Sequence, residues 1–252
     1  MSDAILLDRG DGKIWTITLN RPEALNAITM AMTERLLQIL RDAEHDDAAR
    51  CIVMAANGEA FSAGFDIKEM AGFDEAAMRD AFVRRDPLFK AIALHPLPII
   101  AVLNGKAFGA GALMAAAADF RIATPKTEFK VTAVNYGSAN ATWSLPRLVG
   151  AARAKQILMT GRVVGASEGL AIGLFDELAE ANGLKTALEL AAQIAAKPES
   201  AISNIKRLVN CAIDSPLEEA WQAEFDHVLS QLNLSEQGGN AIFEPFLNRQ
   251  KT

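Results

Sequence analysis

Short apolar runs recur through the first half of the chain. The runs 51–56 (CIVMAA), 98–104 (PIIAVLN) and 120–124 (FRIAT) have the length of buried strands and almost no polar residues. Continuous apolar strands of this kind are typical of a parallel sheet that is covered on both faces. The earlier stretch 4–20 reads as two strands, with Asp11-Gly12 supplying the turn between them.

Helical patterns alternate with these strands and then dominate. Residues 29–46 place Leu36, Leu37 and Leu40 on one helix face, with Thr29 as a suitable N-cap. Alternating strands and helices predict an α/β fold. Beyond residue 150, Gly and Pro separate five further helical segments: 151–162, 165–174, 185–198, 199–214 and 216–233. We therefore expect an α/β core over 1–195 and a helical C-terminal region over 196–252.

Composition and charge narrow the class of protein. The chain has 252 residues and a net charge of −6, which argues against a general nucleic-acid binder. Cys51 and Cys211 lie far apart and outside any CxxC motif, so we expect neither a disulfide nor a metal site. No run reaches the ~18 apolar residues of a membrane span, and residues 1–13 lack an apolar signal region. We expect a cytoplasmic protein without membrane partners.

Two glycine-containing loops follow predicted strands. They are NGEAFSAGFDIKEM (57–70) and NGKAFGAGALMAAAADF (104–120). A glycine turn that opens a helix presents unpaired N–H groups, and two such groups aimed at one point form an oxyanion hole. The second loop lacks the GxGxxG spacing and the later acidic residue of a dinucleotide site, so a nicotinamide cofactor is not expected.

Four ordered blocks between Leu19 and Leu178 give the chain a family resemblance. The sequence resembles the crotonase superfamily, which contains the enoyl-CoA hydratases and isomerases. The resemblance implies a crotonase-like spiral of ββα units, with a helical C-terminal region that builds homotrimers or hexamers. It also implies an acyl-CoA thioester substrate, with coenzyme A as part of the substrate and no separate cofactor. The blocks are LNRPEALNAIT, GEAFSAGFDIKEM, PIIAVLNGKAFGAGALMAAAADFRIAT and LPRLVGAARAKQILMTGRVVGASEGLAIGLFDEL.

The same resemblance implies positions for the site. The backbone N–H groups of Phe65 and Ala110 correspond to the donors that hold the thioester carbonyl. Lys68 either approaches a phosphate of coenzyme A or is a solvated lysine at a helix start. Relatives contact coenzyme A with an aromatic and a basic group from the C-terminal helix of a neighbouring subunit, and Phe243, Phe246 and Arg249 are offered for this by analogy. The two Phe residues either make this contact or pack in a trimer. The remaining positions implied for coenzyme A are Ala24, Leu25, Ala63 and Ile67.

Two aspartates next to these positions invite a catalytic interpretation. Asp66 directly follows Phe65, and Asp119 directly precedes the strand 120–124. The resemblance implies a structural role for both, because the family uses these positions to hold loop and strand.

The chain departs from the family where proton transfer is expected. Hydratases of the family use two glutamates, and the corresponding positions hold Leu113 and Ala133. Positions 129–167 contain no Asp or Glu at all. The segment after Tyr136 is also about three residues shorter than in relatives. Polar candidates for the pocket are Asn135, Tyr136, Ser138, Asn140, Thr142 and Trp143.

An acid for the reaction has few other sources. The helical stretch 73–90 carries four acidic residues, and most of them are expected on a solvated helix face: Asp74, Glu75, Asp80 and Asp86. The three histidines form no catalytic triad or metal-ligand spacing. Three hypotheses follow: an acyl-CoA enzyme, a lyase or isomerase, that stabilises an enolate without glutamate-assisted hydration; a non-catalytic acyl-CoA-binding protein; and an ordinary enoyl-CoA hydratase of fatty acid metabolism.

Overall fold

The computed structural model describes residues 3–180 and 182–233. The chain falls into two compact units, the first ending at Ser203 and the second beginning at Asn204. The division at residue 195 that the sequence suggested stays a prediction. The first unit contains both sheets and the two glycine loops.

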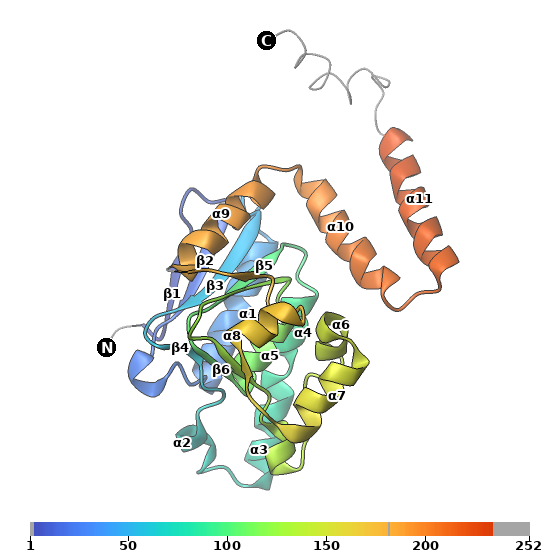
Figure 1. Cartoon of the computed structure of the whole chain (residues 1–252). Helices are drawn as coiled ribbons and strands as arrows, with labels where there is room; N and C mark the ends of the chain where they lie inside the picture. Colours follow the sequence, from blue (N-terminus) through green and yellow to red (C-terminus); the bar gives the residue numbers. More distant parts are fainter. Residues whose placement is uncertain (1–2, 181, 234–252) are drawn as a thin grey trace. The chain divides into compact units, whose positions relative to one another are not determined.

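The larger sheet has six strands in the described part of the chain, in the order β1-β2-β3-β5-β7-β10. Figure 1 labels β1, β2, β3 and β5 of this sheet. The first two strands pair antiparallel, as predicted, and the others pair parallel. The three apolar runs therefore form the central parallel strands that their composition predicts. The bounds are β1 (Ile5–Asp8), β2 (Ile14–Leu19), β3 (Cys51–Ala56), β5 (Ile99–Leu103), β7 (Phe120–Ala123) and β10 (Glu177–Leu178).

A second sheet is built from the strand that follows each central strand. The chain passes from β3 to β4, from β5 to β6 and from β7 to β8, and then into helices each time. Within the described residues this sheet has the order β4-β6-β8-β9. The repeat confirms the expected crotonase-like succession of ββα units. The bounds are β4 (Ala60–Ser62), β6 (Lys106–Phe108), β8 (Glu128–Lys130) and β9 (Val164–Gly165).

The helices follow the predicted segments closely. Thr29 caps the first helix, and its hydroxyl accepts a hydrogen bond from the Met32 N–H. The stretch 73–90, predicted as one helix, is instead two, because Pro87 lacks an N–H and begins a new first turn. The bounds are η1 (Pro22–Ala24), α1 (Met30–Glu44), α2 (Ile67–Met70), α3 (Glu75–Arg85), α4 (Pro87–Ala93), α5 (Ala110–Ala117), η2 (Ala133–Tyr136), α6 (Leu145–Val149), α7 (Ala151–Thr160), α8 (Ala166–Ala171), α9 (Gly183–Ala195), α10 (Glu199–Ala212) and α11 (Leu217–Asn233).

The larger sheet is buried on both faces. Ile52 and Met54 of β3 point into a core shared with α1, α4 and α5. Val53, between them in the chain, points into a second core that is closed by Ala187 and Ala191 of α9. Helix α9 lies across this face of the sheet (Figure 1). Alternate residues of a strand point to opposite faces, so a strand covered on both sides needs the continuous apolar sequence seen in β3.

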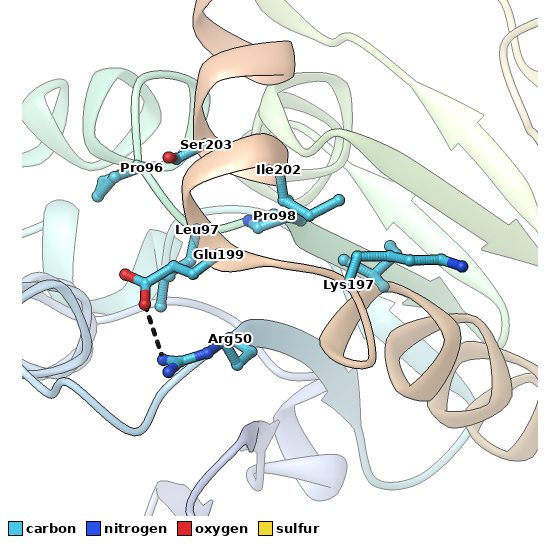
Figure 2. Close-up of a pocket in the computed structure, with 9 residues that line it drawn as sticks. Arg50, Pro96, Leu97, Pro98, Lys197, Glu199, Ile202 and Ser203 are labelled. Atoms are coloured by element: carbon cyan, nitrogen blue, oxygen red, sulfur yellow. Dashed lines mark ion pairs between the residues drawn. The ribbon is translucent and has the colours of Figure 1, made fainter. Parts of the chain in front are cut away.

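A small pocket lies at the amino ends of β3 and β5, where α10 begins. Figure 2 shows Arg50 reaching Glu199, with a guanidinium-to-carboxylate distance of 3.2 Å. Arg50 also donates to the carbonyl oxygens of Asp47 and Ala49. The glycine loops follow β4 and β6, at the carboxyl ends of their strands. The ion pair between Arg50 and Glu199 therefore anchors the start of α10, and this pocket is separate from the two glycine loops.

Among residues 3–180 and 182–233, no helix combines the length and the apolar character that crossing a bilayer requires.

Helix α5 packs so closely on β4 that its second residue has no room for a side chain. A Cβ on Gly111 would lie 2.5 Å from the Ser62 carbonyl oxygen. We expect Gly111→Ala to lower the free energy of unfolding by about 1–3 kcal/mol, because helix and strand must separate. Urea unfolding measures this. Gly72→Ala is the matched control, since a Cβ there meets nothing within 4 Å. Equal stability of the two variants would contradict the packing described.

Candidate active site

The two glycine loops touch each other through their backbones. A Cβ on Gly64 would lie 3.4 Å from the Ala110 nitrogen and 3.5 Å from the Gly109 Cα. Gly64 has φ +108° and Gly109 has φ +51°. Both angles fall in the region that favours glycine over residues with a Cβ. The sequence therefore permits the loop after β4 and the start of α5 to meet with no side chain between them.

The backbone of Phe65 is oriented by its neighbours. Phe65 forms a parallel bridge with Ile28. In that bridge the Ile28 N–H donates to the Gly64 carbonyl at 2.8 Å, and the Asp66 N–H donates to the Ile28 carbonyl at 2.9 Å. Alternate peptide groups of an extended chain point to opposite sides. The Phe65 N–H is therefore turned away from Ile28.

Ala110 supplies a second N–H at the first position of α5. No side chain caps this helix, and Gly109 precedes it. The N–H groups of a first helical turn have no intrahelical acceptor and carry the positive end of the helix dipole. In the part of the chain that the structure describes, neither the Phe65 N–H nor the Ala110 N–H donates to a protein acceptor. Two unused donors thus stand on loops in contact.

Buried polar residues hold the loop that follows β4 through hydrogen bonds. The Ser62 hydroxyl donates to the Asn26 carbonyl at 2.8 Å and accepts from the Gly64 N–H at 3.2 Å. The Asn26 side chain accepts from the Arg21 N–H and donates to the Asn57 and Ala60 carbonyl oxygens. Sequence reasoning did not single out Asn26 or Ser62. The only available signal was their position inside blocks already assigned to the site.

Asp66 holds the loop, as the resemblance implies. Its carboxylate accepts from the N–H groups of Lys68 and Glu69 at the start of α2, and it lies 2.9 Å from the Arg21 guanidinium. Burial alone would raise the pKa of Asp66. The hydrogen bonds from Arg21, Glu69 and Lys68 and the charge of Arg21 outweigh burial and lower that pKa below its usual value. Asp119 likewise accepts from the Ile99 N–H at 2.8 Å and joins β5 to β7.

The positions that the resemblance implies for coenzyme A, Phe246 apart, lie in and beside the loop that follows β4. The Ala63 N–H donates to the Leu25 carbonyl at 2.9 Å, which ties the two segments together. Leu25, Ala63, Ile67 and Lys68 are exposed, and Ala24 is half-buried. Within the described residues the Lys68 ammonium has no salt-bridge partner. Phe246, with Phe243 and Arg249, lies outside the described residues.

Leu113 and Ala133, the two positions for which the resemblance implies glutamate in hydratases, are apolar and mostly covered. Leu113 is half-buried and packs against the main core, and Ala133 is 8% exposed. Ala133 borders a cavity of about 230 Å³ between η2 and α7. Of the polar candidates, Ser138, Asn140 and Thr142 line this cavity, together with Lys155. Asn135, Tyr136 and Trp143 are exposed and are not among its lining residues.

The four acids of the stretch 73–90 differ in their environments. Asp74 caps α3 by accepting from the Ala77 N–H, and Asp80 pairs with Arg84 at 3.2 Å. Glu75 is exposed. Asp86 stands at the junction of α3 and α4 and is exposed, like Glu75. Partial loss of surrounding water raises the pKa of its carboxyl above the usual value.

Arg85, next to Asp86 in the stretch 73–90, is a buried cation that the sequence did not single out. It is 2% exposed, and its guanidinium lies 4.5 Å from the centre of the Phe65 ring. Burial lowers the pKa of Arg85, while the charge and hydrogen bond of Glu69 oppose that effect. Arg84, the preceding residue, is exposed, so the two neighbouring arginines have opposite surroundings.

His45 and His95 make hydrogen bonds to backbone carbonyl oxygens away from the two glycine loops. His45 bonds to the Arg41 carbonyl, and His95 is buried against the Leu40 carbonyl. Across 3–180 and 182–233, no group of three His, Cys, Asp or Glu side chains is placed to hold a metal ion.

Comparison with known proteins identifies the class. Residues 9–244 match the profile of the family described as enoyl-CoA hydratase/isomerase. The short-chain-enoyl-CoA hydratase of Clostridium acetobutylicum is 32% identical over 87% of each chain. The 1,2-epoxyphenylacetyl-CoA isomerase of Escherichia coli is 31% identical over 88% of each chain. The crystal structure of an enoyl-CoA hydratase from Mycobacterium smegmatis superimposes with a TM-score of 0.89 at 30% identity, covering 98% of this chain and 97% of that one.

The fold is therefore that of the crotonase superfamily, with two successive glycine loops in contact at the ends of β4 and β6. The chain belongs to the enoyl-CoA hydratase/isomerase family.

Removal of the Asp66 carboxylate tests the structural role of this residue. We expect Asp66→Asn to lower the free energy of unfolding at neutral pH by about 1–2 kcal/mol, through loss of the helix cap and the Arg21 ion pair. The native pKa is depressed, so the ionised group stabilises the fold above the unfolded-state pKa, about 3.9. That stabilisation is lost as pH falls through the native pKa.

The measurement is urea unfolding of both proteins from pH 7 downwards. The difference in stability stays constant above about pH 5 and shrinks below about pH 4. Glu75→Gln, on the exposed side of α3, is the control and changes stability by less than ~0.5 kcal/mol. A wild-type advantage that grows on acidification would show that Asp66 is not held as a carboxylate.

Proposed function

We propose that this protein is an acyl-CoA enzyme that stabilises a thioester enolate between the backbone N–H groups of Phe65 and Ala110. The observation that supports this proposal most directly is the pair of unused donors on touching loops. Both named relatives act on CoA thioesters by name, one as a hydratase and one as an isomerase. Oriented N–H donors in a site that excludes water contribute several kcal/mol to a developing oxyanion. The Ala110 side chain does not alter the donor, since the N–H is backbone.

The reaction is not glutamate-assisted hydration. Addition of water needs one group to take a proton from water and another to deliver a proton to the α-carbon. Leu113 and Ala133 do neither, and asparagine amides position a water but do not accept its proton. Isomerisation, elimination, C–C cleavage and thioester hydrolysis are the reactions of an enolate or a tetrahedral oxyanion that remain.

The base is Asp86 or a group that the substrate itself carries. Asp86 lies in the chain between Arg85 and Phe89, and both of these residues contact the Phe65 ring. No hydrogen-bond or salt-bridge partner engages its carboxylate within the described residues. A carboxylate with a raised pKa is better matched to proton abstraction near neutral pH than an ion-paired one.

Exchange of the α-proton tests both parts of the proposal. In D2O we expect the protein to incorporate deuterium at the α-carbon of acyl-CoA thioesters, read by mass spectrometry across a panel of acyl chains. Asp86→Asn slows exchange by roughly 100-fold, the usual contribution of a positioned base. Asp80→Asn is the matched control on the same helix and leaves the rate within about twofold, because Asp80 is paired with Arg84.

Each alternative has its own outcome. Binding of CoA esters that raises the melting temperature, without exchange or product, identifies a non-catalytic acyl-CoA-binding protein. Conversion of crotonyl-CoA to 3-hydroxybutyryl-CoA at an ordinary rate identifies an enoyl-CoA hydratase and overturns the assignment of Leu113 and Ala133. Exchange that survives Asp86→Asn assigns the base to the substrate.

Restoring the two carboxylates tests the assignment of these positions. We expect the double variant Leu113→Glu and Ala133→Glu to gain hydratase activity on crotonyl-CoA, measured by loss of the enoyl absorbance. Either single variant gains little, because the two groups act as a unit. The control is a pair of glutamines at the same positions, which have nearly the same size but accept no proton. A double glutamate variant that folds, binds crotonyl-CoA and stays inactive contradicts the assignment.

We also propose that the protein is cytoplasmic and assembles as a homotrimer or hexamer, as the resemblance implies. Apolar side chains in the second unit support an assembly. Trp221 and Phe225 of α11 stack at 5.1 Å and are exposed, as are Ile205 and Val209 of α10. Exposed large apolar side chains that gather on a surface are typical of an interaction site.

A further inference from the structure

The ring of Phe65 is held by a buried cation. Arg85 is the last residue of α3, and its guanidinium lies 4.5 Å from the Phe65 ring centre and 5.9 Å from that of Phe73. Phe89 of α4 packs on the same Phe65 ring, with centroids 6.2 Å apart and planes tilted by 54°. The Phe65 side chain therefore lies between a cation and an aromatic ring, contributed by two successive helices.

The cation is itself fixed from two directions. An Arg85 N–H lies 2.5 Å from the Glu69 carboxylate, and the Nε lies 2.8 Å from the Met30 sulfur. The two Glu69 oxygens also accept from the Met30 N–H, each at 3.1 Å, at the first turn of α1. Glu69 belongs to α2, so α1, α2 and α3 are joined behind Phe65. A carboxylate with these donors is not available as a base.

Stability alone does not require this arrangement. A buried ion pair costs desolvation that apolar side chains of similar volume avoid. The preceding residue, Arg84, shows what an arginine does here without such a constraint. Its side chain is half-exposed and pairs with Asp80 and Glu34 at the surface. Buried polar clusters of this kind fix a geometry more than they add stability.

The geometry being fixed is that of the proposed oxyanion donor. The bridge to Ile28 holds the Phe65 backbone on one side, and the ring contacts hold its side chain. The Gly64 carbonyl, which belongs to the same peptide group as the Phe65 N–H, accepts from the Ile28 N–H, and the ring contacts restrain the side chain that follows. We propose that Arg85, kept in place by Glu69, is a positioning residue that fixes the direction of the Phe65 N–H. This inference rests on the proposed function.

A positioning role predicts a loss in catalysis larger than the loss in binding. Removal of one oxyanion donor costs about 100- to 1,000-fold in kcat. Loosening a donor without removing it costs less, and we expect Arg85→Met to lower kcat by about 10- to 100-fold. The KM for the acyl-CoA changes by less than about threefold, because coenzyme A makes most of the binding contacts elsewhere.

The sharpest measurement is the carbonyl stretch of a bound acyl-CoA carrying ¹³C at the thioester carbonyl. Isotope-edited infrared difference spectra report polarisation of that bond, whether or not the compound reacts. We expect a shift to lower wavenumber in the wild type and loss of most of the shift in Arg85→Met. Arg85→Lys keeps the charge without the planar stack and recovers only part of it. Arg84→Met, the neighbouring surface arginine, keeps the full shift.

Each outcome bears on one claim. A full carbonyl shift in Arg85→Met, with unchanged kcat, overturns the positioning role. If Arg85→Met does not fold, Glu69→Gln and Arg85→Lys take its place, and a full shift in both overturns the role equally. An unshifted carbonyl in the wild type, with the thioester bound, refutes the proposed oxyanion hole itself and is distinguishable from failure at Arg85.

Discussion

The close approach of the backbones at Gly64 and Gly109, with no room for a Cβ between them, places the two proposed donors on neighbouring segments. Both residues have positive φ, and a Cβ on Gly64 would come within 3.4 Å of the Ala110 nitrogen. Phe65 and Ala110 each follow one of these glycines directly. The absence of a Cβ at both glycines is thus what lets the two N–H groups lie on adjacent segments.

The smaller sheet and helix α5 bring these two segments together. Strands β4 and β6 pair parallel, with a register irregularity between Ala60 and Ser62. Their loops therefore leave the same edge of the smaller sheet. Helix α5, whose first residues are Ala-Gly-Ala, packs against β4 at Gly111. Small residues along this helix let it approach β4 closely enough to bring Ala110 beside the preceding loop.

Local patterns predicted much of this fold from the sequence. The apolar runs of β3, β5 and β7 and the cap at Thr29 are local features, and the structure confirms them. The single helix over 73–90 was wrong, because Pro87 starts a new turn. The resemblance brought Phe65 and Ala110 to attention, but their unused N–H groups and the bridge to Ile28 became visible only in three dimensions.

The sequence did not reveal the burial of Arg85 or the contacts of Asn26, because their partners lie far away along the chain. Arg85 finds Glu69 sixteen residues away and Met30 fifty-five residues away, so no pattern within α3 separates it from Arg84. Asn26 reaches the carbonyl oxygen of Ala60 across thirty-four residues. The burial of a charged side chain depends on such contacts. Without knowledge of the contacts, charged residues on a helix are expected to be exposed to solvent.

Placing the donors in the main chain has an evolutionary consequence. A substitution at position 110 changes a methyl group and leaves the N–H, so the proposed activation of a thioester does not depend on the side chain there. Groups that move protons are side chains, and one codon change removes such a group; Leu113 and Ala133 are the positions where we propose that this has happened. Within this architecture a lineage is free to exchange one reaction for another while its hold on the thioester carbonyl persists.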